Sequence, residues 1–204
     1  MKSPFTLRFQ PVPLCWKENR IPVLLTCFIM VATLFMMGRR LWCPAGDLSL
    51  WSLDIWSQHN SQHLADWYTP SHISHGLIFF FLFGAILRGR AQAFVLTASV
   101  MLEAAWELLE NSPIIINRYR SVTIAMDYVG DSVMNSLSDV AWCTLGVILA
   151  SRLKPSAVLG LFLFFELTTL AIVRDNLSLN VLMLIYPLDS VASWQLELAP
   201  TFSH

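Results

Sequence analysis

Charged side chains are scarce in this sequence: only 13% of the 204 residues are Asp, Glu, Lys or Arg. A soluble domain typically contains about 25% charged residues. The apolar residues make up 55% of the chain, lie in long blocks and give a mean hydropathy of +0.57. This composition excludes an ordinary soluble domain and predicts an all-α integral membrane protein.

Several motifs that mark common functions are also missing. The net charge of −1 provides no basic surface, so we expect no nucleic-acid partner. The cysteines form no CxxC pair, and the chain has no Walker phosphate loop, no GxSxG motif and no HExxH motif. Any catalytic or binding site must therefore be found from the placement of single polar residues.

Five apolar blocks are long enough to cross a bilayer. The first, residues 21–37, has no small-residue cleavage site after it and predicts an uncleaved helix. Residues 177–195 would form either a sixth helix, kinked at Pro187, or a shorter interfacial one. We expect one transmembrane domain of five or six helices over residues 21–195, between a cytoplasmic segment at 1–20 and a tail at 196–204. The remaining blocks run over about 72–87, 91–110, 132–150 and 155–173.

The placement of Lys and Arg predicts the orientation of these helices. A cytoplasmic N-terminus puts more basic residues on the inner side (Lys2, Arg8, Lys17, Arg20, Arg88, Arg90, Arg152 and Lys154) than on the outer side (Arg39, Arg40, Arg118, Arg120 and Arg174). The loop at about 39–71 would then be periplasmic. Most of the unusual polar residues would meet at that end, so we expect an inner-membrane protein with a polar pocket open to the periplasm.

Carboxylates occur where membrane helices rarely carry them. Glu103, Glu107 and Glu110 have i, i+4, i+7 spacing, which places them on one face of a helix. Three carboxylates cannot all be ionised side by side in a low dielectric without partners. They suit general acid–base catalysis or cation binding. The alternative is a structural charge network with the arginines Arg118, Arg120 and Arg174.

A second polar series follows at the start of the next apolar block. Asp131, Asn135 and Asp139 are spaced four residues apart, and Asp131 lies where a helix dipole favours an acid. A capping role would explain Asp131 alone. We therefore include Asp131 and Asn135 with the three glutamates as candidate catalytic residues.

His72 and His75 are the candidate metal ligands. Imidazoles three residues apart on a helix can bind one divalent metal ion with carboxylates completing the shell, and His59, His63 and Asp66 lie just upstream. Hydrogen bonds to loop backbone or to acids are the alternative.

Three arginines are the candidate substrate-binding residues. Arg118 and Arg120 suit bidentate binding of a phosphate or carboxylate, and Arg174 lies at the same predicted end. A lipid head group or envelope component would then be the anionic ligand. Salt bridges to the glutamates are the alternative.

Four stretches together resemble a known family: Ser61–His72, Glu103–Pro113, Asp127–Asn135 and Arg174–Asn180. They are similar to a bacterial multi-pass membrane family, the uncharacterised protein family three-one-four, a domain of unknown function. The resemblance implies an inner-membrane location and no particular activity. The order His75, Glu107, Arg120, Asp131, Asn135 and Gly146 is more loosely similar to VanZ-like membrane proteins, which is an analogy of layout alone.

Two functions from different classes fit these residues. One is an intramembrane hydrolase or transferase that acts on a lipid-linked or envelope substrate. The other is a non-catalytic protein that binds a lipid, ion or partner and uses the same pocket as a structural charge network. A transporter fits less well, because transporter sites usually lie near the midplane between repeats and no repeat is visible.

Overall fold

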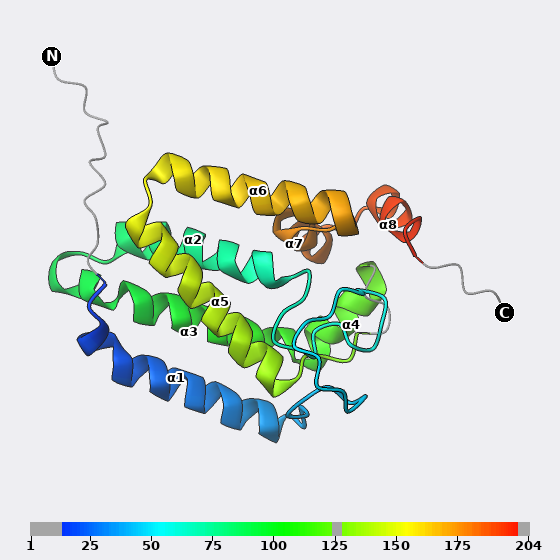
Figure 1. The fold of residues 1–204 in the computed structure, drawn as a ribbon, viewed down its shortest axis with the longest axis horizontal. Helices are drawn as coiled ribbons and strands as arrows, with labels where there is room; N and C mark the ends of the chain where they lie inside the picture. The colour runs from blue at the N-terminus through cyan, green and yellow to red at the C-terminus, as the bar shows by residue number, and fades with distance from the viewer. Residues whose placement is uncertain (1–13, 124–127, 200–204) are drawn as a thin grey trace, which may run out of the picture.

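The computed structural model describes residues 14–123 and 128–199, and all regular elements in these residues are helices except for one parallel bridge between Trp51 and Ala65. Residues 1–13 and 200–204, which belong to the expected terminal segments, lie outside the described residues. Figure 1 shows α1 (Trp16–Met36), α2 (Thr69–Ile86), the 3-10 helix η1 (Gly89–Phe94), α3 (Val95–Glu110), α4 (Pro113–Val122), α5 (Val133–Arg152), α6 (Pro155–Val173), α7 (Leu177–Ile185) and α8 (Asp189–Leu196).

Five segments are long and apolar enough to cross a membrane: α1, α2, η1 with α3, α5 and α6. This finding confirms the expected all-α membrane bundle. The stretch predicted as a possible sixth span is instead two short helices, α7 and α8, of 9 and 8 residues. At about 1.5 Å per residue neither reaches across a hydrocarbon core of about 30 Å.

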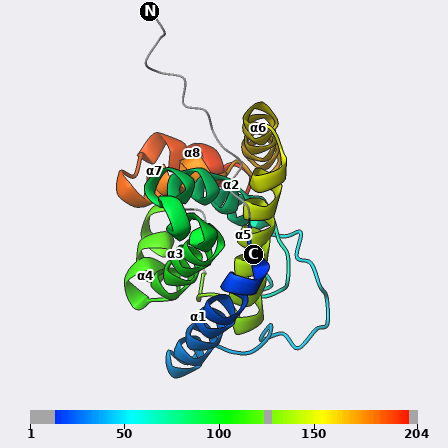
Figure 2. The ribbon, with the colours of Figure 1, turned by 90° about the vertical axis from the view of Figure 1, so that its left-hand side faces the viewer.

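Helix α5 lies inside the bundle, while α1 and α6 flank it on opposite sides (Figure 2). Both flanking helices expose large apolar side chains, among them Phe28 on α1 and Phe164 and Leu167 on α6. Such faces suit contact with lipid chains. The central helices α2, α3 and α5 are therefore the ones that can hold polar groups away from lipid.

Two glycines allow α2 and α5 to pack closely. A Cβ atom added to Gly76 would lie 2.0 Å from the backbone oxygen of Cys143, and one added to Gly146 would lie 2.1 Å from that of Ile73. Small residues commonly permit such approaches between membrane helices. The close contact joins the middle of α2 to the second half of α5. Nearer the polar end, His72 on α2 and Asp139 on α5 lie with Nε2 and Oδ2 3.8 Å apart.

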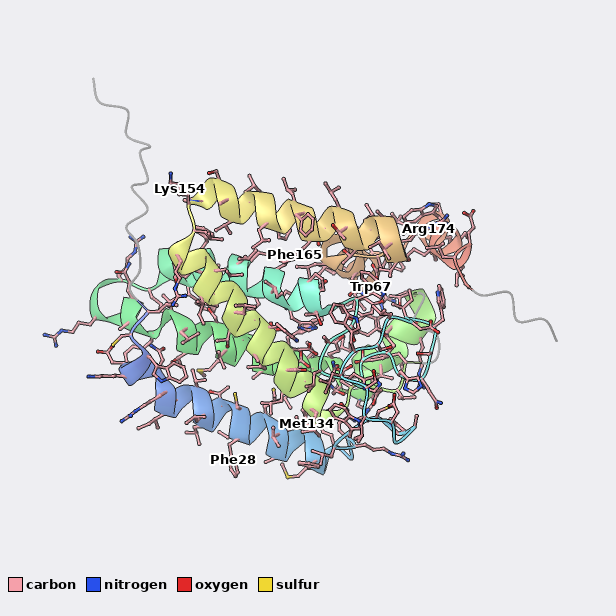
Figure 3. All side chains as sticks on the ribbon, in the orientation of Figure 1. Phe28, Trp67, Met134, Lys154, Phe165 and Arg174 are labelled. Carbon is pink, nitrogen blue, oxygen red and sulfur yellow. The ribbon has the colours of Figure 1, made fainter. Side chains whose placement is uncertain are left out.

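The two ends of the bundle differ in charge. One end, which we call the basic end, carries Lys17, Arg20, Arg88, Arg90, Arg152 and Lys154 at the start of α1 and in the turns α2–η1 and α5–α6. The other end, the polar end, holds the loop 37–68, α4, α7 and α8 (Figure 1). Lys154 and Arg174 mark the two ends of α6 in Figure 3. The predicted meeting of polar residues at one end is present.

The polar end is held together by capped helix starts. Ser132 caps α5 by accepting a hydrogen bond from the Asn135 amide at 3.1 Å, and two more amides of that first turn donate to backbone oxygens of Arg40 and Leu41. Helix α4 was expected to be loop; it begins at Pro113 after the capping residue Ser112.

Candidate functional site

A cavity of about 270 Å³ lies at the polar end, among the loop 37–68 and α2, α3, α4, α5 and α7. One part of its wall is apolar and consists of Phe79, Leu102, Trp106, Leu177 and Val181. The ionisable residues of the wall, tyrosines aside, are Asp66, His72, His75, Glu110, Asp131 and Asp139. Within residues 14–123 and 128–199, no lysine or arginine lines the cavity. The wall is thus amphipathic and rich in carboxylates.

Two imidazoles share one buried carboxylate beneath this cavity. Nδ1 of His72 lies 2.6 Å from Oε1 of Glu103, and Nδ1 of His75 lies 2.9 Å from Oε2 of the same residue. The Glu103 side chain is fully buried, whereas the side chains of His72 and His75 are 10% and 13% exposed. These short contacts fix both rings and are hydrogen-bond distances.

The far nitrogens of the two rings are less engaged. Nε2 of His72 is 3.8 Å from Oδ2 of Asp139 on α5, which is too long for a hydrogen bond. His75 stacks on Phe79 and meets the edge of Trp106. One carboxylate therefore orients two imidazoles that border the cavity.

Glu107 lies one helical turn beyond Glu103 and has a different environment. It is fully buried, and neither carboxylate oxygen has a hydrogen-bond partner among the described residues. Its nearest cationic candidate is Nδ1 of His72, at 3.6 Å. Oxygens of Glu107, Glu110 and Asp131 lie within 4.8 Å of one another. Such a group requires protons or a cation to be stable.

Asp131 is held by a well-made network. Its carboxylate accepts hydrogen bonds from Nδ2 of Asn111 and from the Tyr128 hydroxyl, both at 2.8 Å, and its amide donates to Oδ1 of Asn111 at 2.8 Å. Burial raises the pKa of Asp131 to about 6, although the two donors act in the opposite direction. Burial, with the Asp131 charge next, also raises the pKa of Tyr128 well above its usual value. Asp131 can therefore change protonation near neutral pH.

Asn135 joins the cavity to the loop 37–68. Its side-chain amide donates to the backbone oxygen of His63 at 2.7 Å. In the same region Nε2 of Gln62 donates to the oxygen of Gly130 at 2.8 Å. Gly130 has φ +90, and a Cβ there would lie 2.1 Å from the Arg39 guanidinium. Asn135 therefore lines the cavity and also forms a hydrogen bond with the backbone of the loop 37–68.

Helix α7 closes the cavity on the side of α4. The Tyr119 hydroxyl donates to Oδ1 of Asn180 at 3.0 Å, and Tyr68 donates to Asp175 at 3.4 Å. Burial raises the pKa of Asp175 to about 6. The start of α7 is fixed by Glu166 on α6, whose carboxylate accepts the amides of Leu177 and Ser178 at 3.0 and 3.1 Å.

The three predicted arginines lie outside the cavity wall. Nε of Arg118 donates to the Leu184 oxygen at 3.0 Å, and Nε of Arg120 donates to the Tyr128 oxygen at 2.5 Å. Arg174 pairs with Glu197 at 2.9 Å and lies over the Trp194 ring. The structure brings His72, His75, the glutamates, Asp131 and Asn135 together, and it does not bring the arginines to them.

Comparison with known proteins identifies relatives along most of the chain. A family model described as "Protein of unknown function (DUF2585)" matches residues 34–197. The UPF0314 protein of Sinorhizobium fredii is 47% identical over 82% of this chain and 85% of its own. The chain belongs to the UPF0314 family. No solved structure matches this UPF0314 chain.

Other relatives support the same membership. The UPF0314 protein of Rhizobium meliloti is 46% identical over 88% of this chain and 93% of its own, and that of Paracoccus denitrificans is 44% identical over 83% and 89%. The predicted family resemblance is therefore confirmed. The matches do not show the looser similarity of this UPF0314 chain to VanZ-like proteins.

Several residues of the UPF0314 site were absent from the sequence-based set. Asn111, Tyr119, Tyr128 and Asn180 were not singled out; the only signal for Asn111 was its place after the glutamate series. The histidines also separate into two groups, because His59 and His63 lie with Cys43 and Asp47, away from His72 and His75. For a divalent metal at the cavity, His72, Glu107 and Asp139 offer ligand atoms within 4.8 Å of one another.

Proposed function

We propose that the cavity is the active site of an intramembrane hydrolase or transferase in which His72 and His75 carry protons to and from the substrate. The observation that supports this proposal is the shared Glu103 carboxylate, 2.6 and 2.9 Å from the two Nδ1 atoms. A carboxylate at Nδ1 selects one tautomer of a neutral imidazole and leaves Nε2 to accept a proton.

Two imidazoles on one carboxylate can divide the work of acid and base. Glu103 balances a single positive charge, so one ring can be protonated while the other is neutral. The protonated ring would then donate to a leaving group while the neutral ring activates the attacking hydroxyl or water. General acid–base catalysis of this kind contributes about 10²–10⁴-fold to a rate.

The chemistry of the wall favours an amphipathic substrate. The apolar residues of the wall, which include Phe79 and Trp106, suit a hydrocarbon chain, and the wall also contains four carboxylates. An anionic group would be repelled there, because the arginines expected to hold it bind backbone oxygens and Glu197 instead. A lipid-linked or envelope substrate with a neutral or cationic polar part fits better.

The proposed location is the bacterial inner membrane, with the N-terminus cytoplasmic. The basic end defined above carries six Lys and Arg residues and one acid, Glu18, among the described residues of those helix ends and turns. Basic ends of membrane bundles usually face the cytoplasm. The cavity would then open toward the periplasm.

The test is a comparison of lipid and envelope extracts from cells that express wild type, His75→Ala or Glu103→Gln at equal levels. Mass spectrometry should find a substrate consumed and a product formed with wild type only. Asp54→Asn, an exposed loop acid, is the control and should behave as wild type. Identical profiles with wild type and His75→Ala would overturn the enzymatic proposal.

The second candidate function is non-catalytic cation binding, and it is favoured by the partnerless carboxylate of Glu107. Oxygen-rich sites prefer hard cations such as Mg²⁺ or Mn²⁺. Mn²⁺ titration followed by electron paramagnetic resonance should show a bound ion that is lost in Glu107→Gln. Absence of saturable Mn²⁺ binding in wild type would leave protons to neutralise the cluster and would reject this candidate.

A further inference from the structure

A second cluster of metal-ligating side chains lies in the loop 37–68, apart from the catalytic cavity. It contains Cys43, Asp47, His59 and His63, each of which offers one ligand atom, and these four atoms lie within 4.8 Å of one another. The first two follow α1, and the other two precede α2 by a few residues. The loop must fold back on itself to bring the pairs together.

The distances in this cluster match those of ligands around one zinc ion. Nδ1 of His59 lies 3.3 Å from Nε2 of His63 and 3.4 Å from Sγ of Cys43. Oδ1 of Asp47 lies 3.6 and 3.5 Å from the same two nitrogens. With Zn–N of about 2.0 Å and Zn–S of about 2.3 Å, tetrahedral geometry separates ligand atoms by roughly 3.3–3.6 Å. The pair at Glu103 and His72, at 2.6 Å, is closer than this spacing.

Burial supplies an independent observation. The side chain of His63 is 1% exposed, and its Nδ1 has no hydrogen-bond partner, so its polar contacts are made by Nε2 inside the cluster. Oδ1 of Asp47 is likewise buried without a hydrogen bond, although the rest of that side chain is partly exposed. Trp42 holds the backbone of Asp47 by a 2.6 Å hydrogen bond and packs its edge against His63. The buried Oδ1 of Asp47 lacks a partner that a cation bound by the four ligand atoms would provide.

We propose that Cys43, Asp47, His59 and His63 bind one Zn²⁺ ion in a closed tetrahedral site. A thiolate and two imidazoles favour zinc over Mg²⁺ or Ca²⁺, which prefer oxygen ligands. Four protein ligands leave no open position, which is typical of structural sites. The ion would therefore hold the loop and would take no part in the acid–base chemistry of the cavity.

The position of this zinc site connects it to the cavity wall. The backbone oxygen of His63 receives the hydrogen bond from Asn135, and Asn60 and Ser61, between the two histidine ligands, line the cavity. The Ser61 oxygen also accepts the amide of Ser132 at the start of α5. Zinc would fix this part of the wall in place, much as a disulfide would.

The test measures metal on the full-length protein in detergent, purified without chelators. Wild type should carry about one zinc per chain, and replacement by Co²⁺ should give a thiolate-to-cobalt charge-transfer band. Cys43→Ser and the more exposed His59→Ala should each weaken zinc binding by at least about tenfold and abolish or alter the band. Cys15→Ser and His75→Ala are matched controls and should retain both.

Each other outcome counts against the proposal. Wild type with neither zinc nor a cobalt–thiolate band would overturn it, and this result does not depend on whether a variant folds. Zinc kept in Cys43→Ser but lost in His75→Ala would move the metal to the cavity. If wild type contained copper instead of zinc, and only the loss of Cys43 removed that copper, the metal would not be zinc and the proposal would be wrong. The readout is independent of the proposed enzymatic activity, so either idea can fail alone.

Discussion

Two fully buried polar side chains at opposite ends of the bundle differ in how many of their hydrogen-bonding atoms have partners. At the basic end, the fully buried Asn19 uses its whole hydrogen-bonding capacity: Nδ2 donates to the oxygens of Cys15 and Ala93, each at 2.7 Å, and Oδ1 accepts the amide and hydroxyl of Thr97 at 3.0 and 2.6 Å. At the polar end, the equally buried Glu107 has no hydrogen bond on either oxygen.

This difference distinguishes a polar side chain that stabilises the fold from one that does not. The side-chain amide of Asn19 joins α1 to the η1–α3 segment, and all of its hydrogen-bonding groups have partners. An unsatisfied carboxylate costs folding free energy unless a proton, cation or ligand reaches it. The polar end therefore carries groups whose presence stability alone does not explain, and substitutions at the two ends should have opposite consequences.

The largest expected effect is on activity at the polar end. His75→Ala and Glu103→Gln should each lower turnover of the substrate, once identified, by about 10²–10⁴-fold, because each removes part of the proton-transfer pair. Turnover per folded molecule of Asn19→Ala should stay within about threefold of wild type. A comparable loss of turnover in Asn19→Ala would refute the proposed difference in function between the polar end and the basic end.

Next in size is the stability loss at the basic end. Asn19→Ala strands the amide of Thr97 and the oxygen of Ala93, and we expect a loss of about 3 kcal/mol, since each stranded group costs about 1–3 kcal/mol. Thermal unfolding in detergent measures it. Thr33→Ala, which removes a single exposed bond to the Ile29 oxygen, is the control and should change little.

The sharpest comparison is between two glutamates on one helix. Glu107→Gln should leave thermal stability unchanged or raise it by about 1–2 kcal/mol, because a neutral amide is cheaper to bury than an unpaired carboxylate. Glu103→Gln should lower it, because both imidazoles lose their charged partner. If Glu107→Gln were the more destabilised of the two, the 3.6 Å contact between Glu107 and Nδ1 of His72 would be a stabilising ion pair, and the proposed contrast would be wrong.

The pH dependence of stability tests the Asp131 network. Its folded-state pKa of about 6 lies above the ordinary value of 3.8, so the folded protein binds this proton more tightly than the unfolded chain does. The resulting stabilisation is full below about pH 4 and is lost as pH rises through about 6. Asp131→Asn should flatten this part of the profile. An unchanged slope between those pH values would refute the assignment.

The smallest effect is expected for the arginines. Arg118→Ala and Arg120→Ala remove hydrogen bonds to backbone oxygens. Neither guanidinium lines the cavity, so activity should change by less than about threefold and stability by about 1 kcal/mol. Direct binding of a candidate anionic lipid to wild type and each variant provides the measurement. A loss of lipid binding above tenfold would support the substrate-binding role predicted from the sequence.

The sequence was sufficient for the parts of the fold that follow from hydropathy. The five long apolar blocks appear as α1, α2, η1 with α3, α5 and α6, within a few residues of their expected bounds. The gathering of polar residues at one end follows from the alternating direction of successive helices. Helix α4 escaped prediction because its ten residues are too few for a spanning block, although Ser112 and Pro113 are a typical helix start.

The site was predictable only as a set of residues. The i, i+4, i+7 spacing of Glu103, Glu107 and Glu110 placed them on one face correctly, but spacing could not tell that Glu103 forms hydrogen bonds with both histidines and Glu107 with neither. The partners of Arg118 and Arg120 are backbone oxygens, which carry no sequence signal. The Cys43 cluster depends on how an irregular loop folds, and periodicity says nothing about that.

The paired glycines between α2 and α5 set the spacing of these two helices beside the cavity. Gly76 and Gly146 allow the backbones of α2 and α5 to approach closely, and the same two helices carry His72 and Asp139, whose Nε2 and Oδ2 atoms are 3.8 Å apart. Alanine at either glycine would push the helices apart and widen that separation without altering any polar group. The spacing of two polar side chains at the cavity thus depends on two residues that have no side chain.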